Sequence, residues 1–331
     1  MNIRYVMKAA PYYFEQLLDR AVKFEHIGIK PAIELHLFGS KDVFGKNRSI
    51  VEENCKKIHG CDYIVHFPIF DLETGYIYDA ASFDMRLFKQ VLDFCNAIGS
   101  HYLIMHRCFG FEGALEKGDA EENFFKILAE WNRDAMEHNI LLLIENYGFV
   151  WLPDALKKDF LVSPIDHFFP WDMERFLEIK NILSLENVDI LLDIAHASIS
   201  CNMFNMLKHK NFLKHDRRFA NITEEDIKKK DVLFVSDFIM DSTHFFHISD
   251  TFVWKPSNGL DEMKKYLYTE NLPIGSGNID FPILFDKMPD NKWMIMEIDP
   301  ADGNYADNIA QLDGITYFRK LVKEGKPCVS L

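Results

Sequence analysis

The chain of 331 residues is 48% hydrophobic, enough for a large core, and carries a formal net charge of -14 at pH 7. This acidity argues against a nucleic-acid-binding protein, which needs a basic surface to meet phosphates. No apolar run reaches the roughly 18–20 residues of a membrane span, and the chain begins without a signal-peptide pattern. Its six cysteines are scattered without a CxxC pair, which favours reduced thiols in a cytoplasmic protein.

Short apolar, β-rich runs alternate with stretches of helical periodicity from one end of the chain to the other. Strands are predicted at 3–7, 32–38, 62–69, 101–108, 140–147, 189–197, 244–250 and 292–299. Helices are predicted at 12–26, 49–59, 83–98, 120–138, 172–183, 202–208, 281–286 and 306–324. Eight strand–helix units of about 41 residues each favour one (β/α)8 TIM barrel, with residues 1–331 as a single domain.

The rival fold is a doubly wound sheet, which would carry a glycine-rich phosphate loop after its first strand. The sequence has no such loop there, and GSGN (275–278) precedes the seventh helix without matching GxGxxG. Three loop insertions follow the fifth, sixth and seventh strands, at 152–171, 208–241 and 251–273. Long loops between barrel elements often form lids or substrate walls.

Metal-capable residues recur where the predicted strands end. From the third strand to the eighth these residues are His66, His106, Glu145, Asp193, His247 and Glu297. The carboxyl ends of barrel strands converge on one face, so residues far apart in sequence can meet there. The last four offer oxygen and imidazole ligands, which suit Mn²⁺, Mg²⁺, Co²⁺, Fe²⁺ or Zn²⁺.

Asp193 is the least expected of these residues, because it lies in the apolar run DILLDIAHA (189–197). An ionised carboxylate is costly to bury unless a cation pairs with it. Taken singly, each residue has a simpler interpretation: Asp193 could pair with a lysine, and His66 and His106 could be hydrogen-bonded residues of the barrel mouth. Glu34, in the second strand, could pair with a lysine or face the substrate. The joint pattern over six consecutive strands favours a metal site.

The sequence also resembles a known superfamily, through motifs spread over nearly the whole chain. They are IEL (33–35), HFP (66–68), the IMH that ends at His106, IEN (144–146), LDIAH (192–196), HISD (247–250), IGSGNIDF (274–281) and IMEID (295–299). In this order they resemble the xylose-isomerase-like TIM-barrel superfamily. This group includes sugar isomerases and epimerases and the endonuclease-four type of abasic-site nuclease.

The epimerase and isomerase branch implies one divalent metal ion, held by Glu145, Asp193, His247 and Glu297. It implies that Glu145 and Glu297 are the catalytic acid and base, moving a proton of an open-chain sugar through a cis-enediolate. His196, three residues after Asp193, would contact the substrate. The expected partner is therefore a small-molecule sugar, with no nucleic acid or membrane, and a homo-oligomer is left open.

The sequence differs from each of the two branches at one place. The nuclease branch uses an Asp-x-His pair for a third metal, and Thr269 and Asn271 occupy those positions, which argues against abasic-site cleavage. The epimerase branch usually has an arginine shortly after the histidine of the seventh strand. Here Val253 and Trp254 stand in its place, so Lys255 is the expected substrate-binding residue.

The alternative function is a one- or two-metal phosphoester hydrolase of the endonuclease-four-like type. His66 and His106 match two further histidines of that branch and leave room for a second metal beside Glu145. In the isomerase interpretation both histidines, with Glu34, would bind substrate instead. A third interpretation is a metal-binding barrel without catalysis, against which the intact pair of Glu145 and Glu297 argues.

Overall fold

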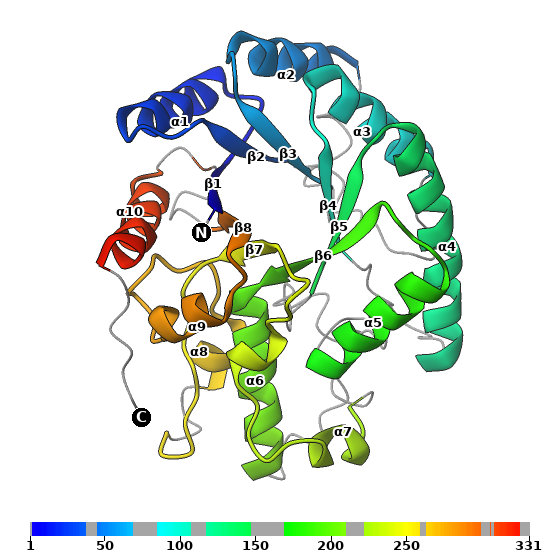
Figure 1. Cartoon of the computed structure of the whole chain (residues 1–331), viewed down its shortest axis with the longest axis vertical. Coiled ribbons are helices and arrows are strands. Elements are labelled where there is room, and N and C mark those ends of the chain that lie inside the picture. The colour runs from blue at the N-terminus through cyan, green and yellow to red at the C-terminus, as the bar shows by residue number, and fades with distance from the viewer. Residues whose placement is uncertain are drawn as a thin grey trace.

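The computed structural model places eight parallel strands in a closed barrel, which confirms the predicted (β/α)8 fold (Figure 1). Each strand pairs with its neighbours in chain order, and the first also pairs with the eighth. The strands are β1 (Asn2–Ala9), β2 (Ala32–His36), β3 (Asp62–His66), β4 (Tyr102–His106), β5 (Leu141–Glu145), β6 (Val188–Asp193), β7 (Phe245–Ile248) and β8 (Asn291–Met296). The structure describes residues 2–37, 45–68, 85–106, 117–146, 169–209, 222–258, 263–298, 305 and 308–324.

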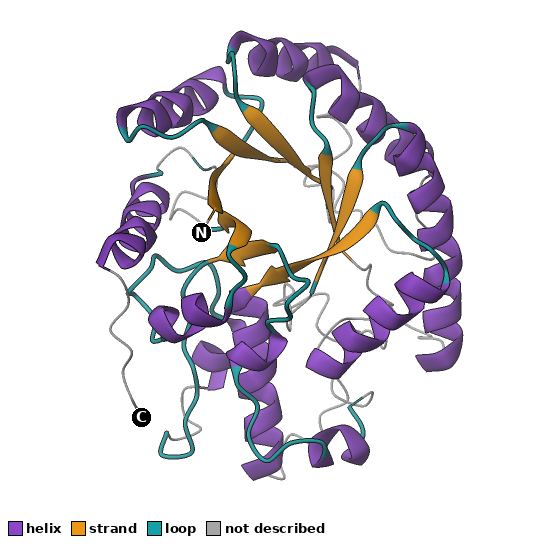
Figure 2. Cartoon of the chain, viewed as in Figure 1, coloured by secondary structure: helices purple, strands orange, loops and turns teal. Residues whose placement is uncertain are grey.

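Helices surround the barrel on its outside (Figure 2). They are α1 (Phe14–His26), α2 (Gly45–Lys57), α3 (Met85–Ile98), α4 (Lys117–Glu137), α5 (Pro170–Ile182), α6 (Ile194–His209), α9 (Phe281–Lys287) and α10 (Ile309–Glu324). Shorter helices α7 (Glu224–Lys228), η4 (Val235–Phe238) and α8 (Met263–Tyr268) lie in the connections that follow β6 and β7. None of the helices in the described part of the chain is long and apolar enough to span a membrane.

An apolar layer fills the inside of the barrel, with one residue from each strand. Its members are Val6, Ala32, Ile64, Ile104, Leu143, Leu191, Phe245 and Ile295. Side chains alternate between the two faces of a strand, so the residue two positions later points into the barrel again. That next inward position lies nearer the carboxyl ends of the strands, where TIM barrels carry their active sites.

The boundary between β6 and α6 differs from the prediction. The run 189–197 was predicted as one strand with a helix at 202–208, but β6 ends at Asp193 and α6 begins at Ile194. The Asp193 carboxylate caps the helix, because its Oδ1 accepts a hydrogen bond of 2.5 Å from the backbone N–H of His196. Helix α6 is buried on nearly all sides, so its apolar start lacks the one-sided pattern of a surface helix.

The connection after β7 is held together by Asp250. Its carboxylate accepts hydrogen bonds from the backbone N–H groups of Gly275 (2.8 Å), Gly277 (2.9 Å) and Ile279 (3.2 Å). A Cβ at Gly277 would lie 2.1 Å from the Thr251 carbonyl oxygen, so only glycine fits. The GSGN segment is therefore a turn that closes on Asp250, and this carboxylate is already occupied by backbone donors.

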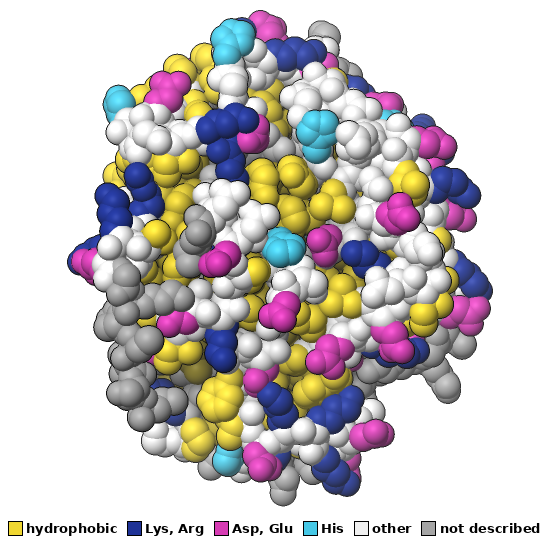
Figure 3. Space-filling model, in the orientation of Figure 1, with side chains coloured by type: hydrophobic (Ala, Val, Ile, Leu, Met, Phe, Trp, Pro, Cys, Tyr) yellow, Lys and Arg dark blue, Asp and Glu magenta, His cyan; other side chains and the backbone are white. Residues whose placement is uncertain are grey.

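Parts of the three predicted insertions lie outside the described residues, namely 152–168, 210–221 and 259–262. On the face of the molecule shown in Figure 3, the described lysine and arginine side chains are interspersed with acidic ones.

Candidate metal centre

Eight ionisable side chains form the next inward layer of the barrel, each two residues after a member of the apolar layer. We call this set the polar ring; it consists of Lys8, Glu34, His66, His106, Glu145, Asp193, His247 and Glu297. Seven of its members are buried, and the Glu297 side chain is 13% exposed. The ring brings together all the predicted metal ligands and adds Lys8, which sequence reasoning missed.

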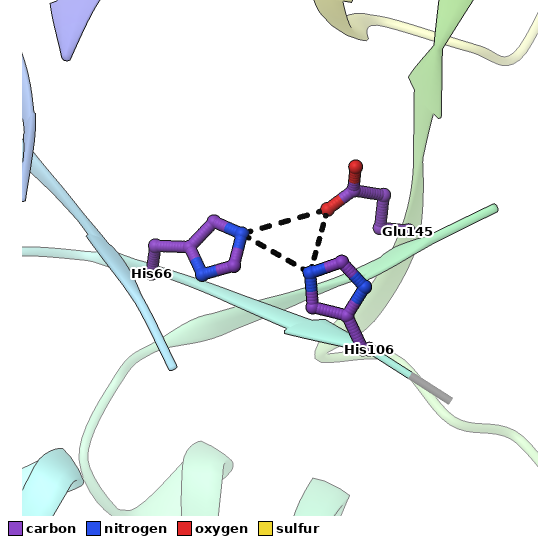
Figure 4. Close-up of side chains that lie close together, drawn as sticks. All are labelled: His66, His106 and Glu145. Atoms are coloured by element: carbon purple, nitrogen blue, oxygen red, sulfur yellow. Dashed lines mark hydrogen bonds and ion pairs between the residues drawn. The ribbon is translucent and has the colours of Figure 1, made fainter. Parts of the chain in front are cut away.

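His66, His106 and Glu145 form the first group that could hold a cation, with ligand atoms all within 4.8 Å of one another. They come from β3, β4 and β5 and point toward one another (Figure 4). Glu145 Oε2 lies 3.2 Å from His106 Nε2 and 3.6 Å from His66 Nε2. The Nδ1–H of His66 donates to the Phe67 carbonyl at 2.9 Å, which leaves Nε2 as the nitrogen directed into the group.

Glu145, Asp193, His247 and Glu297 form a second group, again within 4.8 Å, and share Glu145 with the first. His247 Nδ1 faces all three carboxylates, at 3.0 Å from Glu145 Oε1, 2.5 Å from Glu297 Oε2 and 3.9 Å from Asp193 Oδ2. A nitrogen and three carboxylates from four successive strands provide the donor set that divalent metals take in proteins.

Glu34 supports this second group from behind. Its Oε2 lies 3.0 Å from His247 Nε2, and its Oε1 lies 3.3 Å from Lys8 Nζ. A carboxylate that accepts the outer N–H of a histidine fixes its ring and directs the other nitrogen toward a metal. The structure thus places Glu34 in the ion pair that the sequence left open as the alternative to a substrate contact.

Three buried carboxylate oxygens of the second group have no hydrogen bond from any described residue: Glu145 Oε2, Asp193 Oδ2 and Glu297 Oε2. Buried polar atoms are nearly always satisfied. Glu145 Oε2 and Glu297 Oε2 each lie near a histidine nitrogen, at 3.2 and 2.5 Å, whereas the nearest such nitrogen to Asp193 Oδ2 is 3.9 Å away, so this last oxygen most clearly calls for another partner. The polar ring also sets four carboxyl groups against one lysine, an excess of acidic groups. Both observations fit a divalent cation.

The same charges shift the pKa values of the ring. Burial raises the pKa of Asp193 to about 7, an effect that the carboxylates of Glu297 and Glu145 reinforce. Although burial lowers it, the pKa of His247 is held well above its usual value by Glu297, Glu145 and Glu34. Burial lowers the pKa of His106 to about 3, so this histidine is neutral at physiological pH, as a metal ligand must be.

His196 lies beside the ring, in the first turn of α6. Its Nδ1–H donates to the Asn146 carbonyl at 3.0 Å, and its Nε2 lies 3.2 Å from Glu270 Oε2. Asn146 also ties β5 to β6, because it exchanges two hydrogen bonds with the backbone of Asp193. Sequence reasoning missed Glu270, which lies two residues before Leu272, whose backbone pairs with that of Asp250. Lys255 is exposed, and among the described residues it makes no ion pair with the ring.

These features define a TIM barrel in which groups of side chains that could hold a divalent metal lie at the carboxyl ends of the strands. The chain belongs to the xylose isomerase-like TIM barrel family, whose sequence model matches residues 59–315. A comparison with functionally curated proteins gives no significant match.

Solved structures with the same fold cover nearly the whole chain at low identity. A D-tagatose 3-epimerase-like protein is 17% identical, with a TM-score of 0.56 over 96% of this chain and 98% of its own. A D-allulose 3-epimerase from Methylomonas sp., in complex with D-allulose, is 11% identical, with a TM-score of 0.58 over 96% and 97%. A Thermus thermophilus protein soaked with ZnCl2 is 13% identical, with a TM-score of 0.57 over 99% and 100%.

Proposed function

We propose that the chain is a divalent-metal-dependent isomerase or epimerase of a sugar or a related polyol acid. The carrying observation is the second group, in which carboxylate oxygens of Glu145, Asp193 and Glu297 all lie within 3.9 Å of His247 Nδ1. Family membership and the sugar epimerases among the similar structures support the substrate class.

In this proposal Glu145, Asp193, His247 and Glu297 hold the metal, whose identity among Mn, Mg, Co, Fe and Zn stays open. When bound, a divalent cation supplies Lewis-acid polarisation of two adjacent substrate oxygens. Glu145 and Glu297 are the acid/base pair: one removes the proton from the carbon beside the carbonyl, and the other returns a proton to the cis-enediolate. His196 orients a substrate hydroxyl from the first turn of α6.

The second candidate is a two-metal phosphoester hydrolase, which the sharing of Glu145 by two ligand groups favours. Adjacent metals bridged by a carboxylate are typical of two-metal hydrolysis. A third metal at the positions of the nuclease branch is not supported, because Thr269 carries no carboxylate and the Asn271 amide oxygen lies 3.4 Å from Ser249 Oγ. In this alternative His66 and His106 are ligands rather than substrate contacts.

Proton exchange in D₂O tests the proposal. The wild-type protein is incubated with a panel of ketoses and aldoses, and mass spectrometry follows the incorporation of deuterium into the sugar. Deuterium is expected on the carbon beside the carbonyl. Glu297→Gln should slow this exchange by about 10²- to 10⁴-fold, the usual contribution of a general acid or base. Metal content is measured on the same samples, since Glu297 is also a proposed ligand.

Asp189→Asn is the matched control, because Asp189 is a half-buried acid on β6 outside the polar ring and should retain full exchange. Unchanged exchange in Glu297→Gln would remove Glu297 from the acid/base pair. Absence of exchange across the panel, with two metals per chain and phosphoester cleavage that depends on His66 and His106, would favour the hydrolase.

A further inference from the structure

Lys8 is the member of the polar ring that no metal-binding role explains. It lies on β1 with 1% of its surface exposed. Among the described residues it is the only lysine or arginine that pairs with the carboxylates of the ring. A buried ammonium is costly, so its position between acids calls for a reason beyond packing.

The backbone of Lys8 is fixed from both sides. Its N–H donates to Gln311 Oε1 of α10 at 2.8 Å, and its carbonyl accepts from Arg20 Nε of α1 at 2.6 Å. Arg20 is itself fully buried and donates to the Gln16 carbonyl at 3.1 Å. The backbone of Lys8 is therefore held in place, and its side chain extends from there into the barrel.

The Lys8 ammonium has two carboxylate neighbours. Lys8 Nζ contacts Glu297 Oε1, and Glu34 Oε1 lies 3.3 Å away. The Tyr305 ring covers the ammonium from 5.6 Å, at the outer limit of a cation–π contact. Glu297 is the one hydrogen-bond acceptor of the ammonium among the described residues, although a lysine can donate three hydrogen bonds.

The ammonium lies at the edge of the proposed metal centre. Glu297, which Lys8 contacts, belongs to the second ligand group, and Glu34, His66 and Glu297 themselves lie within 4.8 Å of one another. A substrate oxygen beside Glu297 would therefore come within reach of the ammonium. A fixed, water-excluded positive charge is most effective where negative charge develops during a reaction.

We propose that Lys8 is a catalytic residue that donates a hydrogen bond to a substrate oxygen on which negative charge develops. The inference rests on the proposed function and deepens it: in the isomerase this oxygen belongs to the enediolate, and Lys8 stabilises it while Glu297 transfers the proton. The ammonium donates a hydrogen bond and keeps its own proton. A lysine that only balanced the charge of Glu34 and Glu297 would not contact the substrate, so its removal would not weaken the binding of an enediolate-like anion.

The test is the binding of glycolohydroxamate, a small planar anion with two adjacent oxygens like an enediolate, to the metal-loaded protein by calorimetry. Lys8→Met keeps the length of the side chain and removes its charge. It should weaken binding by about 10- to 100-fold, the contribution of a hydrogen bond to a charged group. Metal content, measured by elemental analysis, should equal that of the wild type. Lys8→Gln tests the same point if the Met variant does not fold.

Lys292→Met is the matched control, because Lys292 is an equally buried lysine at the opposite end of the barrel, where it donates to the Pro289 carbonyl at 2.8 Å. It should bind the hydroxamate within twofold of the wild type. Wild-type affinity in the Lys8 variants, or weaker binding that follows loss of metal, would overturn the catalytic role. The assay needs no turnover, so if sugar exchange fails while Lys8→Met still weakens binding, the isomerase proposal falls and the assignment of Lys8 stands.

Discussion

Glu34 contacts two neighbours of the proposed metal centre, His247 and Lys8. It contacts His247 on one oxygen and Lys8 on the other, and it is fully buried. Outer carboxylates of this kind raise the basicity of the histidine and fix its orientation. Glu34 is therefore proposed to act through His247.

Glu34→Gln is expected to lower metal affinity by about 10- to 100-fold, as the loss of such a partner usually does. The amide can still accept a hydrogen bond, so His247 should keep its place while it loses the electrostatic support. Competition with a metal-binding dye gives the affinity. Glu186→Gln, at an exposed acid between α5 and β6, is the control; an affinity equal to that of the wild type in Glu34→Gln would show that Glu34 does not act through His247.

Seven members of the polar ring could be found from the sequence. Six are an acid or a histidine at or near a predicted strand end, and Glu34 is an acid within the second predicted strand. Lys8 could not be found in that way, since lysine is not an ordinary metal ligand. It does follow Val6 by two residues, as each ring member follows its apolar layer residue, so strand periodicity alone would have placed it in the barrel. Glu270 carries no such signal, because it lies in a loop that meets the strand-seven connection through the pairing of Leu272 with Asp250.

At the scale of elements, the junction of β6 and α6 combines a helix cap and a proposed metal ligand in Asp193. The strand ends there because the carboxylate turns back to the His196 N–H. An Asp before an apolar stretch is a helix-start signal, yet the continuous apolar run also fits a buried strand. Periodicity could not separate the two, so the sequence predicted the strand but not its end.

Substitutions at Asp193 should separate these two roles. Asn caps a helix about as well as Asp, whereas Ala does not. Both variants are expected to lose most of the metal, but in metal-free protein Asp193→Ala should be less stable than Asp193→Asn by about 1 kcal/mol. Urea unfolding of the two variants measures the difference. Equal stability would mean that the cap contributes little to α6.

For the whole molecule, the excess of negative charge in the polar ring should link stability to metal binding. Chelation with EDTA is expected to lower the melting temperature by about 4 °C, since a ligand at 100 times its Kd contributes about 2.7 kcal/mol. Differential scanning calorimetry before and after dialysis into Zn²⁺ or Mn²⁺ measures the shift. Asp193→Asn should respond much less. A melting temperature that is the same with and without metal would contradict a cation in the ring.

The place where α6 begins has a further consequence for the metal-free protein. The peptide dipoles of this 16-residue helix add up to a partial positive charge at its first turn, beside Asp193 and the other acids of the ring. That charge offsets part of the repulsion among the carboxylates when no cation is bound. The same dipole opposes a cation and attracts an anion, so α6 helps the empty barrel to fold and favours a substrate that becomes negatively charged as it reacts.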